Sequence, residues 1–167
     1  PPPFKALWRS FGLSRELPSD TVLFHGLSGE LPSGLRKRGV RSVVTIHDLI
    51  FLRFPAYYKP VDRWIYTLKF RSACRSADRI IAISEATKRD VMHFFGIPER
   101  KIDVIYQGCD DRFKHPVDEA TLGDVRRRHA LPDHYILSVG SIEERKNLLL
   151  LLQAVAVVPS PRHGVGG

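Results

Sequence analysis

Short apolar runs alternate with longer segments of helical period along most of the chain. The runs are rich in Val, Ile and Leu and predict five strands, at residues 21–24, 42–46, 79–83, 101–108 and 135–140. Apolar residues at helical spacing predict helices at residues 4–13, 62–78, 84–96 and 147–158. Strands that alternate with helices are typical of βαβ units, so the pattern predicts an α/β fold with a mostly parallel sheet.

Local signals mark the ends of two of these helices. Asp62 is a plausible N-cap of the 62–78 helix, and Ser84 is expected to cap the 84–96 helix, which Gly96 should end. The 4–13 helix carries Phe4 and Trp8 on one face, so it could lie on a membrane or pack on the sheet, and we favour the sheet. The stretch from 109 to 133 is polar and predicts a linker with a short charged helix.

Polar or glycine residues stand at the end of every predicted strand. In open parallel sheets, ligands bind outside the carboxyl ends of the strands. The sequence therefore predicts a ligand site at this edge of the sheet. The five positions that point to it are His25, His47, Ser84, Gln107 and Gly140.

Each of these residues also has an ordinary structural interpretation. His47 directly follows a buried strand and could contact a sugar hydroxyl, or it could only bond to backbone. Asp48 could orient that imidazole or cap the turn that follows. His25 carries the same ambiguity as His47. Ser84 is expected to cap its helix, whose N-terminal N–H groups could also meet an anion.

The segment "VGSIEERKN", residues 139–147, combines a strand end with a charged loop and a helix start. Gly140 would let a ligand approach the backbone, and Arg145 and Lys146 would suit a diphosphate. The alternative is a solvated loop in which Glu143 and Glu144 pair with these two cations. The residues leave both interpretations open.

Composition narrows the class of protein. The chain has 167 residues and a net charge of +8, which favours phosphates, nucleotides, nucleic acid or an anionic membrane surface as partners. Its two cysteines, Cys74 and Cys109, are expected to be ordinary reduced thiols. There is no GxGxxG, no P-loop, no GxSxG and no metal-ligand spacing. The basic runs at 36–41 and 126–129 match no nucleic-acid module, so nucleic acid is not an expected partner.

Five motifs appear in an order that resembles family 4 glycosyltransferases. They are "FHGLSGELP", "VVTIHDLIF", "ADRIIAISEATKRDV", "KIDVIYQGCDDRF" and "YILSVGSIEERKN", and the resemblance covers roughly residues 20–158. The family consists of retaining enzymes of the GT-B fold, with two Rossmann-like domains, an active-site cleft between them and a nucleotide-sugar donor. The resemblance thus implies a Rossmann-like parallel sheet and a transferase that moves a hexose to a glycan or lipid-linked acceptor, in cell-surface polysaccharide synthesis.

The same resemblance assigns domains and roles. Residues 1–107 match the second half of the N-terminal, acceptor-binding domain, 108–133 a linker, and 134–167 the start of the C-terminal, donor-binding domain. His47 matches the family histidine near the transferred sugar, and Lys146 the lysine on the donor diphosphate. Gly140, Ser141 and Arg145 are expected beside Lys146. Many family members have an arginine at the position of Ser141. Sugar or acceptor contacts are expected from His25, Asp48, Ser84 and Gln107.

Neither a cofactor nor a metal is implied, because cationic side chains neutralise the leaving diphosphate in this family. The family's Gly-rich loop and its late pair of glutamates are missing from the chain, and the chain does not start with Met. We therefore expect a central fragment of a cytoplasmic enzyme, peripheral on the inner face of the membrane, that does not turn over substrate alone. The alternative is a non-catalytic basic α/β module that binds phosphates or nucleic acid.

Overall fold

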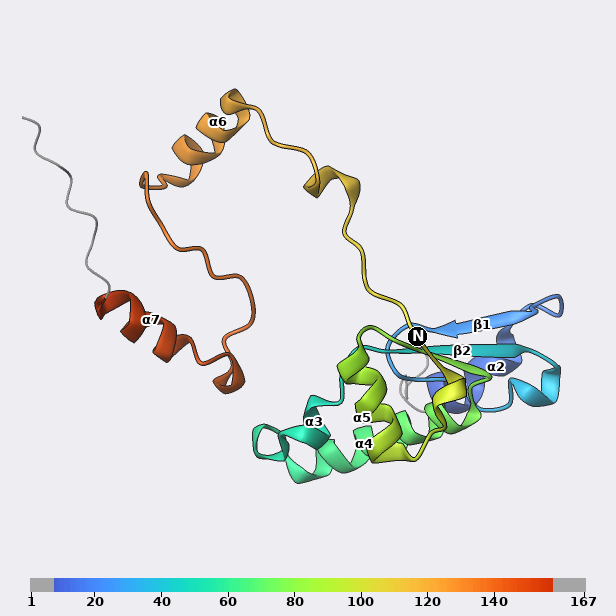
Figure 1. The fold of residues 1–167 in the computed structure, drawn as a ribbon. Helices are drawn as coiled ribbons and strands as arrows, with labels where there is room; N and C mark the ends of the chain where they lie inside the picture. The colour runs from blue at the N-terminus through green and yellow to red at the C-terminus, as the bar shows by residue number, and fades with distance from the viewer. Residues whose placement is uncertain (1–7, 158–167) are drawn as a thin grey trace, which may run out of the picture. The chain divides into compact units, whose positions relative to one another are not determined.

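A four-stranded parallel sheet organises the first part of the protein. The computed structural model describes residues 8–157 and divides into two compact units, one that ends at Gly108 and one that begins at Cys109. The first unit contains β1 (Leu23–Gly26), β2 (Arg41–Ile46), β3 (Arg79–Ala82) and β4 (Ile102–Val104). The strands lie side by side in chain order and every pairing is parallel, which confirms the expected Rossmann-like α/β fold (Figure 1).

The long helices of this unit lie against one face of the sheet. The first unit contains the short helices α2 (Leu13–Glu16) and α3 (Ile50–Arg53) and the long helices α4 (Pro60–Ser76) and α5 (Glu85–Phe95), with a π-helical turn at Trp8–Gly12. Figure 1 shows α4 and α5 on the same side of the strands. Crossovers between parallel strands are right-handed, so strands added in one direction place their helices on one face.

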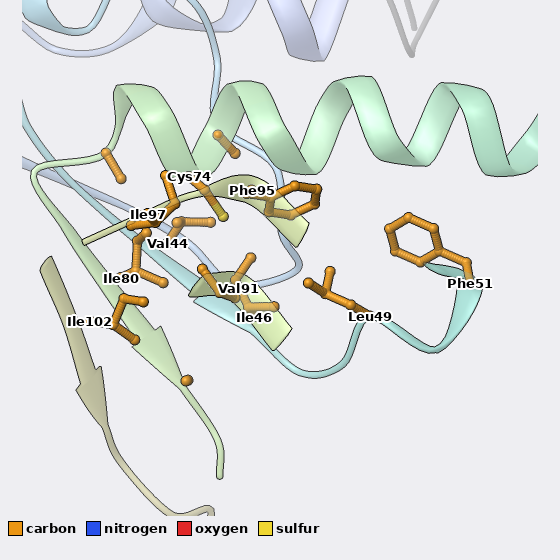
Figure 2. Packing of buried hydrophobic residues seen from close by; sticks show 13 residues of the cluster. Val44, Ile46, Leu49, Phe51, Cys74, Ile80, Val91, Phe95, Ile97 and Ile102 are labelled. Carbon is orange, nitrogen blue, oxygen red and sulfur yellow. The ribbon is translucent and has the colours of Figure 1, made fainter. Parts of the chain in front are cut away.

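The core lies between the sheet and helices α4 and α5. Side chains alternate along a strand, so Val44 and Ile46 of β2 and Ile80 of β3 point to the same face. All three are fully buried, as is Cys74 on α4. Figure 2 shows them packed together with further residues of the cluster, which include Leu49, Phe51, Val91, Phe95, Ile97 and Ile102.

The predicted cap Ser84 and the predicted end Gly96 of α5 are confirmed, whereas the prediction that Asp62 caps α4 is wrong. The Ser84 side chain accepts from the backbone N–H of Thr87, and Gly96 closes α5 in the left-handed region at φ 65°. Helix α4 begins two residues before Asp62, at Pro60. Proline at the first helical position has its φ already set and needs no hydrogen-bond partner for an N–H. Asp62 instead lies in the first turn, where the helix dipole favours a carboxylate.

Two strands, β1 and β4, differ from their expected bounds by more than one residue at an end. Strand β1 begins at Leu23 rather than Thr21 and includes His25 and Gly26. Leu23 is 54% exposed, and Val22 just before the strand is 77% exposed, because β1 is an edge strand of the described sheet. Strand β4 covers only 102–104 of the expected 101–108.

The second unit has helices but no strand among its described residues. Helices α6 (Glu119–His129) and α7 (Leu148–Val157) match the expected charged helix and the expected apolar helix. The strand expected at 135–140 is absent, so the described sheet has four strands rather than five. A strand needs a hydrogen-bonded neighbour, and no other segment of this unit supplies one within the described residues. Of the expected 4–13 helix, residues 4–7 lie outside the described residues.

The two cysteines differ sharply in environment. Cys74 is buried and Cys109 is exposed. Burial raises the pKa of the Cys74 thiol to about 12, although Lys101 opposes the shift. We expect iodoacetamide at about pH 8 to alkylate Cys109 alone, because Cys74 is buried and its raised pKa keeps that thiol protonated. Mass spectrometry of the labelled chain, with a urea-unfolded sample as control, checks this. Rapid labelling of Cys74 in the folded chain would contradict it.

Candidate active site at the carboxyl edge of the sheet

A cavity of about 420 Å³ lies at the carboxyl edge of the sheet, on the face opposite the core. We call it the carboxyl-edge cavity. It brings together His25, His47 and Gln107, three of the five residues expected at this edge. The strand residues of the lining, His25, Thr45 and Ile81, alternate with the core positions and so point to the opposite face. His47 and Gln107 follow the ends of β2 and β4. The full lining is His25, Leu27, Thr45, His47, Ile81, Ile83, Ile105, Tyr106 and Gln107.

His25 and Thr45 are joined across β1 and β2. The Nε2 atom of His25 lies 2.8 Å from Oγ1 of Thr45. Thr45 is buried at 9% exposure, whereas the imidazole of His25 is exposed. The pair therefore fixes one edge of the His25 ring and leaves the rest of the ring to the cavity.

His47 is held by a backbone carbonyl. Its Nε2 lies 2.9 Å from the carbonyl oxygen of Leu27. A carbonyl can only accept, so Nε2 carries the proton and donates it. In the neutral ring, Nδ1 then has a free lone pair that can accept a proton from a hydroxyl group. The structure thus combines the two expected interpretations of His47, since one nitrogen is used by the fold and the other is available.

Asp48 holds the turn that follows His47. Its Oδ1 accepts from the backbone N–H of Ile50 at 3.1 Å, at the start of α3. No hydrogen bond joins Asp48 to His47 within residues 8–157. Helix α3 is then tied to α5, because the Arg53 guanidinium forms an ion pair with Asp90. The segment after His47 is thereby anchored at both ends.

Ser84 reaches the site through Thr87, a residue that sequence reasoning missed. Thr87 Oγ1 donates to the carbonyl of His47 at 3.0 Å, and it lies 3.0 Å from Ser84 Oγ. Since the single Thr87 hydroxyl proton points to His47, Ser84 must donate to Thr87. The Ser84 hydroxyl is therefore engaged in hydrogen bonds within the protein. The sequence signal for Thr87 was its position three residues after Ser84, because a serine N-cap accepts a hydrogen bond from the backbone N–H of the third helical residue.

We expect Thr87→Val to lower the free energy of unfolding by about 1–3 kcal/mol, because the carbonyl of His47 loses its buried donor. Thr87 is 5% exposed. Urea unfolding followed by circular dichroism measures the loss. Thr121→Val is the matched control, since Thr121 occupies the equivalent position of α6 beside Asp118 but is exposed. Equal losses in the two variants would count against a specific role for Thr87.

Gln107 lies three residues beyond the end of β4, and both Gln107 and Tyr106 are exposed. Neither makes a side-chain hydrogen bond within the described part of the chain. Their side chains therefore remain available to a ligand in the carboxyl-edge cavity.

The charged segment 139–147 belongs to the second unit. Gly140 has φ 151°, and a short helical turn at Glu144–Lys146 precedes α7. Arg145 Nε donates to Glu143 at 2.6 Å, and Ser141 also donates to this carboxylate. These two hydrogen bonds lower the pKa of Glu143.

The solvated-loop interpretation thus describes Arg145. It does not describe Lys146, whose exposed amino group has no side-chain partner in residues 8–157. Lys146 remains available to an anion.

Residues 8–157 offer neither a metal-binding cluster nor a membrane-spanning helix. These residues contain no group of three or more His, Cys, Asp or Glu side chains placed to hold a metal ion. Within the same range, no helix has both the length and the apolar character needed to cross a membrane.

Comparison with known proteins identifies relatives over most of the chain. The O-antigen chain mannosyltransferase B of Escherichia coli is 30% identical over 139 residues, 82% of this chain. The serotype-specific mannosyltransferase WbdA of Escherichia coli is 30% identical over 124 residues, 72% of this chain. An N-acetylgalactosaminyltransferase of Campylobacter jejuni that acts on a diphospho-undecaprenol-linked substrate is 32% identical over 80 residues, 48% of this chain.

The aligned chain spans only part of these relatives, namely 35%, 15% and 20% of their respective lengths. Residues 1–113 match the family described as Glycosyltransferase Family 4. This match covers more than half of the chain and includes the whole four-stranded sheet with its carboxyl-edge cavity. The chain therefore belongs to glycosyltransferase family 4.

Proposed function

We propose that this chain is part of a retaining glycosyltransferase that moves a hexose from a nucleotide diphosphate sugar to a glycan or lipid-linked acceptor. The observation that carries the proposal is the grouping of His25, His47 and Gln107 around one cavity at the carboxyl edge of a parallel sheet. Two of the relatives are named as mannosyltransferases, one of them for the O-antigen chain. Mannose is therefore the first sugar to test, and cell-surface polysaccharide synthesis the process to which we assign the protein.

The carboxyl-edge cavity suits a sugar. Its lining combines the apolar side chains of Ile81, Ile83 and Ile105 with hydrogen-bonding side chains. Apolar surface against a ring face and a few directed polar groups are what small-molecule sites provide. The Nδ1 atom of His47 can accept a proton from a sugar hydroxyl, while its Nε2–H keeps the ring in place on the carbonyl of Leu27.

The segment 139–147 suits the diphosphate. We assign Lys146 to a direct contact with the phosphates and Gly140 to close backbone approach. The leaving diphosphate gains charge in the transition state, and a cation placed there lowers the barrier. Ser141 donates its single hydroxyl proton to Glu143, so its binding to phosphate requires that it leave this carboxylate. Arg145 uses only Nε on Glu143, and its terminal nitrogens can donate to phosphate while that bond is kept. In a retaining transfer the acceptor attacks the face from which the diphosphate departs, so the protein acts by positioning both substrates.

We assign residues 1–107 to the acceptor-binding domain, 108–133 to the connection and 134–167 to the donor-binding domain. The net charge of +8 supports peripheral contact with the anionic inner face of the cytoplasmic membrane. One relative is named for a substrate linked to undecaprenol, a lipid, which supports a lipid-linked acceptor for this chain as well.

The competing function is a basic module without catalysis. The last turn of α6 carries the exposed residues Arg126, Arg127 and Arg128. A cluster of this kind attracts phosphates or nucleic acid without a shaped site. The two functions differ in which cations matter, and the Lys146 substitution in the Discussion separates them.

The proposal is tested by following the histidine ring signals of the 15N-labelled chain by NMR during titration with nucleotide sugars and saccharide acceptors. We expect the His25 and His47 signals to shift, because both rings line the carboxyl-edge cavity. His93 is the internal control, since it is exposed on α5 and does not line this cavity. Unchanged His25 and His47 signals with every sugar would refute the assignment.

A second assay concerns turnover. We expect the pure chain to show no sustained transfer from nucleotide sugars to saccharide or lipid-linked acceptors, because the family's Gly-rich loop and glutamate pair are missing from its sequence. Repeated transfer by this chain alone would disprove that expectation, but it would not contradict the proposed sugar site.

A further inference from the structure

A second cavity of the first unit lies on the helix-covered face of the sheet. It has a volume of about 460 Å³ and reaches Ser42 near the amino end of β2. We call it the amino-edge cavity. Its walls are the π-helical turn near Ser10, the loop from Glu30 to Arg36 and the C-terminal half of α4. It shares no lining residue with the carboxyl-edge cavity.

The walls of the amino-edge cavity are fastened to one another. The backbone N–H and the hydroxyl of Ser33 both donate to the carbonyl of Ser10, at 2.8 and 2.9 Å. Arg38 donates to the carbonyls of Ser14 and Leu17. Gly34 has φ 92°, and a Cβ atom there would lie 3.1 Å from Ser14 Oγ. The loop is therefore closed against the N-terminal segment, and the cavity is part of the folded structure.

The charges that line this cavity are unbalanced. Three cations face it, Arg36, Lys69 and Arg75, against a single carboxylate. That carboxylate, Glu30, is already paired with Lys69 at 3.0 Å. The exposed guanidinium groups of Arg36 and Arg75 have no side-chain partner in the described residues. Two positive charges therefore remain for a ligand.

A hydroxyl group lies beside these cations. Ser72 is exposed on α4, one turn before Arg75, and its hydroxyl has no hydrogen-bond partner in residues 8–157. Guanidinium groups match the oxygens of a phosphate in bidentate geometry, and a serine hydroxyl can donate to a third oxygen. Arg38 differs from these residues, because its guanidinium is used to hold backbone carbonyls.

We propose that the amino-edge cavity binds a phosphate or diphosphate group through Arg36, Arg75 and Ser72. This site shares no residue with the proposed sugar and donor contacts, so substitutions can test it without altering them. The phosphate can come from a free phosphorylated molecule or from the headgroup of an anionic lipid, since the recognising chemistry is the same.

Isothermal titration calorimetry with inorganic pyrophosphate, at constant ionic strength, tests the free source with the 167-residue chain. Co-sedimentation with vesicles of equal parts phosphatidylcholine and phosphatidylglycerol tests the lipid source. We expect Arg36→Gln and Arg75→Gln each to weaken binding about tenfold, the usual effect of one lost charged hydrogen bond. Arg89→Gln is the charge-matched control, since Arg89 is exposed on α5 and unpaired within residues 8–157.

Glu30→Gln gives a test in the opposite direction. It should strengthen binding because it frees Lys69 from its partner, whereas Asp133→Asn, at an exposed position of the second unit, should not. Thermal unfolding of each variant verifies that the fold is intact.

Binding of either probe that falls in the Arg36 and Arg75 variants, but not in Arg89→Gln, supports the proposal and identifies the source. The proposal is wrong if neither probe binds. It is also wrong if Arg89→Gln weakens binding as much as Arg36→Gln and Arg75→Gln, or if Asp133→Asn strengthens it as much as Glu30→Gln, because general charge attraction would then explain the result.

Discussion

Ile46→Ala should lower the free energy of unfolding by about 2–5 kcal/mol, a large part of the roughly 5–15 kcal/mol that a typical domain has. Ile46 is fully buried at the end of β2 and packs in the core cluster (Figure 2). The substitution removes apolar contact and leaves a space that the neighbouring side chains cannot fill. Because Ile46 directly precedes His47, the loss should also disturb the carboxyl-edge cavity. Urea unfolding followed by circular dichroism measures the effect.

Ile105→Ala is the matched control for this substitution. The same side chain is shortened by the same atoms, but Ile105 is 53% exposed beyond the end of β4. We expect a change of no more than about 0.5 kcal/mol there, as for most surface positions. Similar losses at both positions would mean that the helix-covered face is not the core of this unit.

Lys146→Ala should weaken the affinity for a nucleotide diphosphate sugar by about tenfold to a hundredfold, if Lys146 contacts the diphosphate as we propose. Its amino group is exposed and has no side-chain partner in the described residues. A hydrogen bond between two charged groups would therefore form on binding without breaking another one. Calorimetric titration of the chain with mannose and other hexose donors gives the affinities.

Arg128→Ala is the control for Lys146→Ala, because it removes one exposed cation from the same unit at the end of α6. We expect little change in the affinity for the nucleotide sugar. The opposite pattern would favour the basic module over the transferase: substitution of Arg126, Arg127 or Arg128 would weaken the affinity for the nucleotide sugar, and substitution of Lys146 would not change it. Comparison of Lys146→Ala with Arg128→Ala thus distinguishes specific binding of the nucleotide sugar from general attraction to its negative charge.

The sequence by itself determined the longer helices, α4 to α7, and the class of fold. Helix hydrogen bonds join residues four apart, so the signals that start and stop a helix are local. Ser84 and Gly96 therefore predicted both ends of α5. Strand β2 was equally predictable, since its β-branched residues predicted a strand at 42–46 and the structure has it at 41–46. The alternation of these elements was enough to predict a parallel sheet and a ligand site at its carboxyl edge.

Strands depended on partners that the sequence does not identify. Residues 135–140 have the composition of a strand, yet no neighbour in the second unit pairs with them among the described residues, and they form none. Strand β1 is shifted by two residues and exposed, because its bounds follow its register with β2 rather than its own apolar run. Ladder hydrogen bonds join residues far apart in the chain, so local pattern cannot set them.

Only the tertiary structure decided how the site residues are used. Sequence placed His25, His47, Ser84 and Gln107 at one edge, but it could not tell which of their polar atoms the fold consumes. The structure assigns Nε2 of His47 to the carbonyl of Leu27 and the Ser84 hydroxyl to Thr87. These partners lie on other strands, loops or helices and meet only when the sheet forms, because hydrogen bonding between side chains requires positions within about 3 Å.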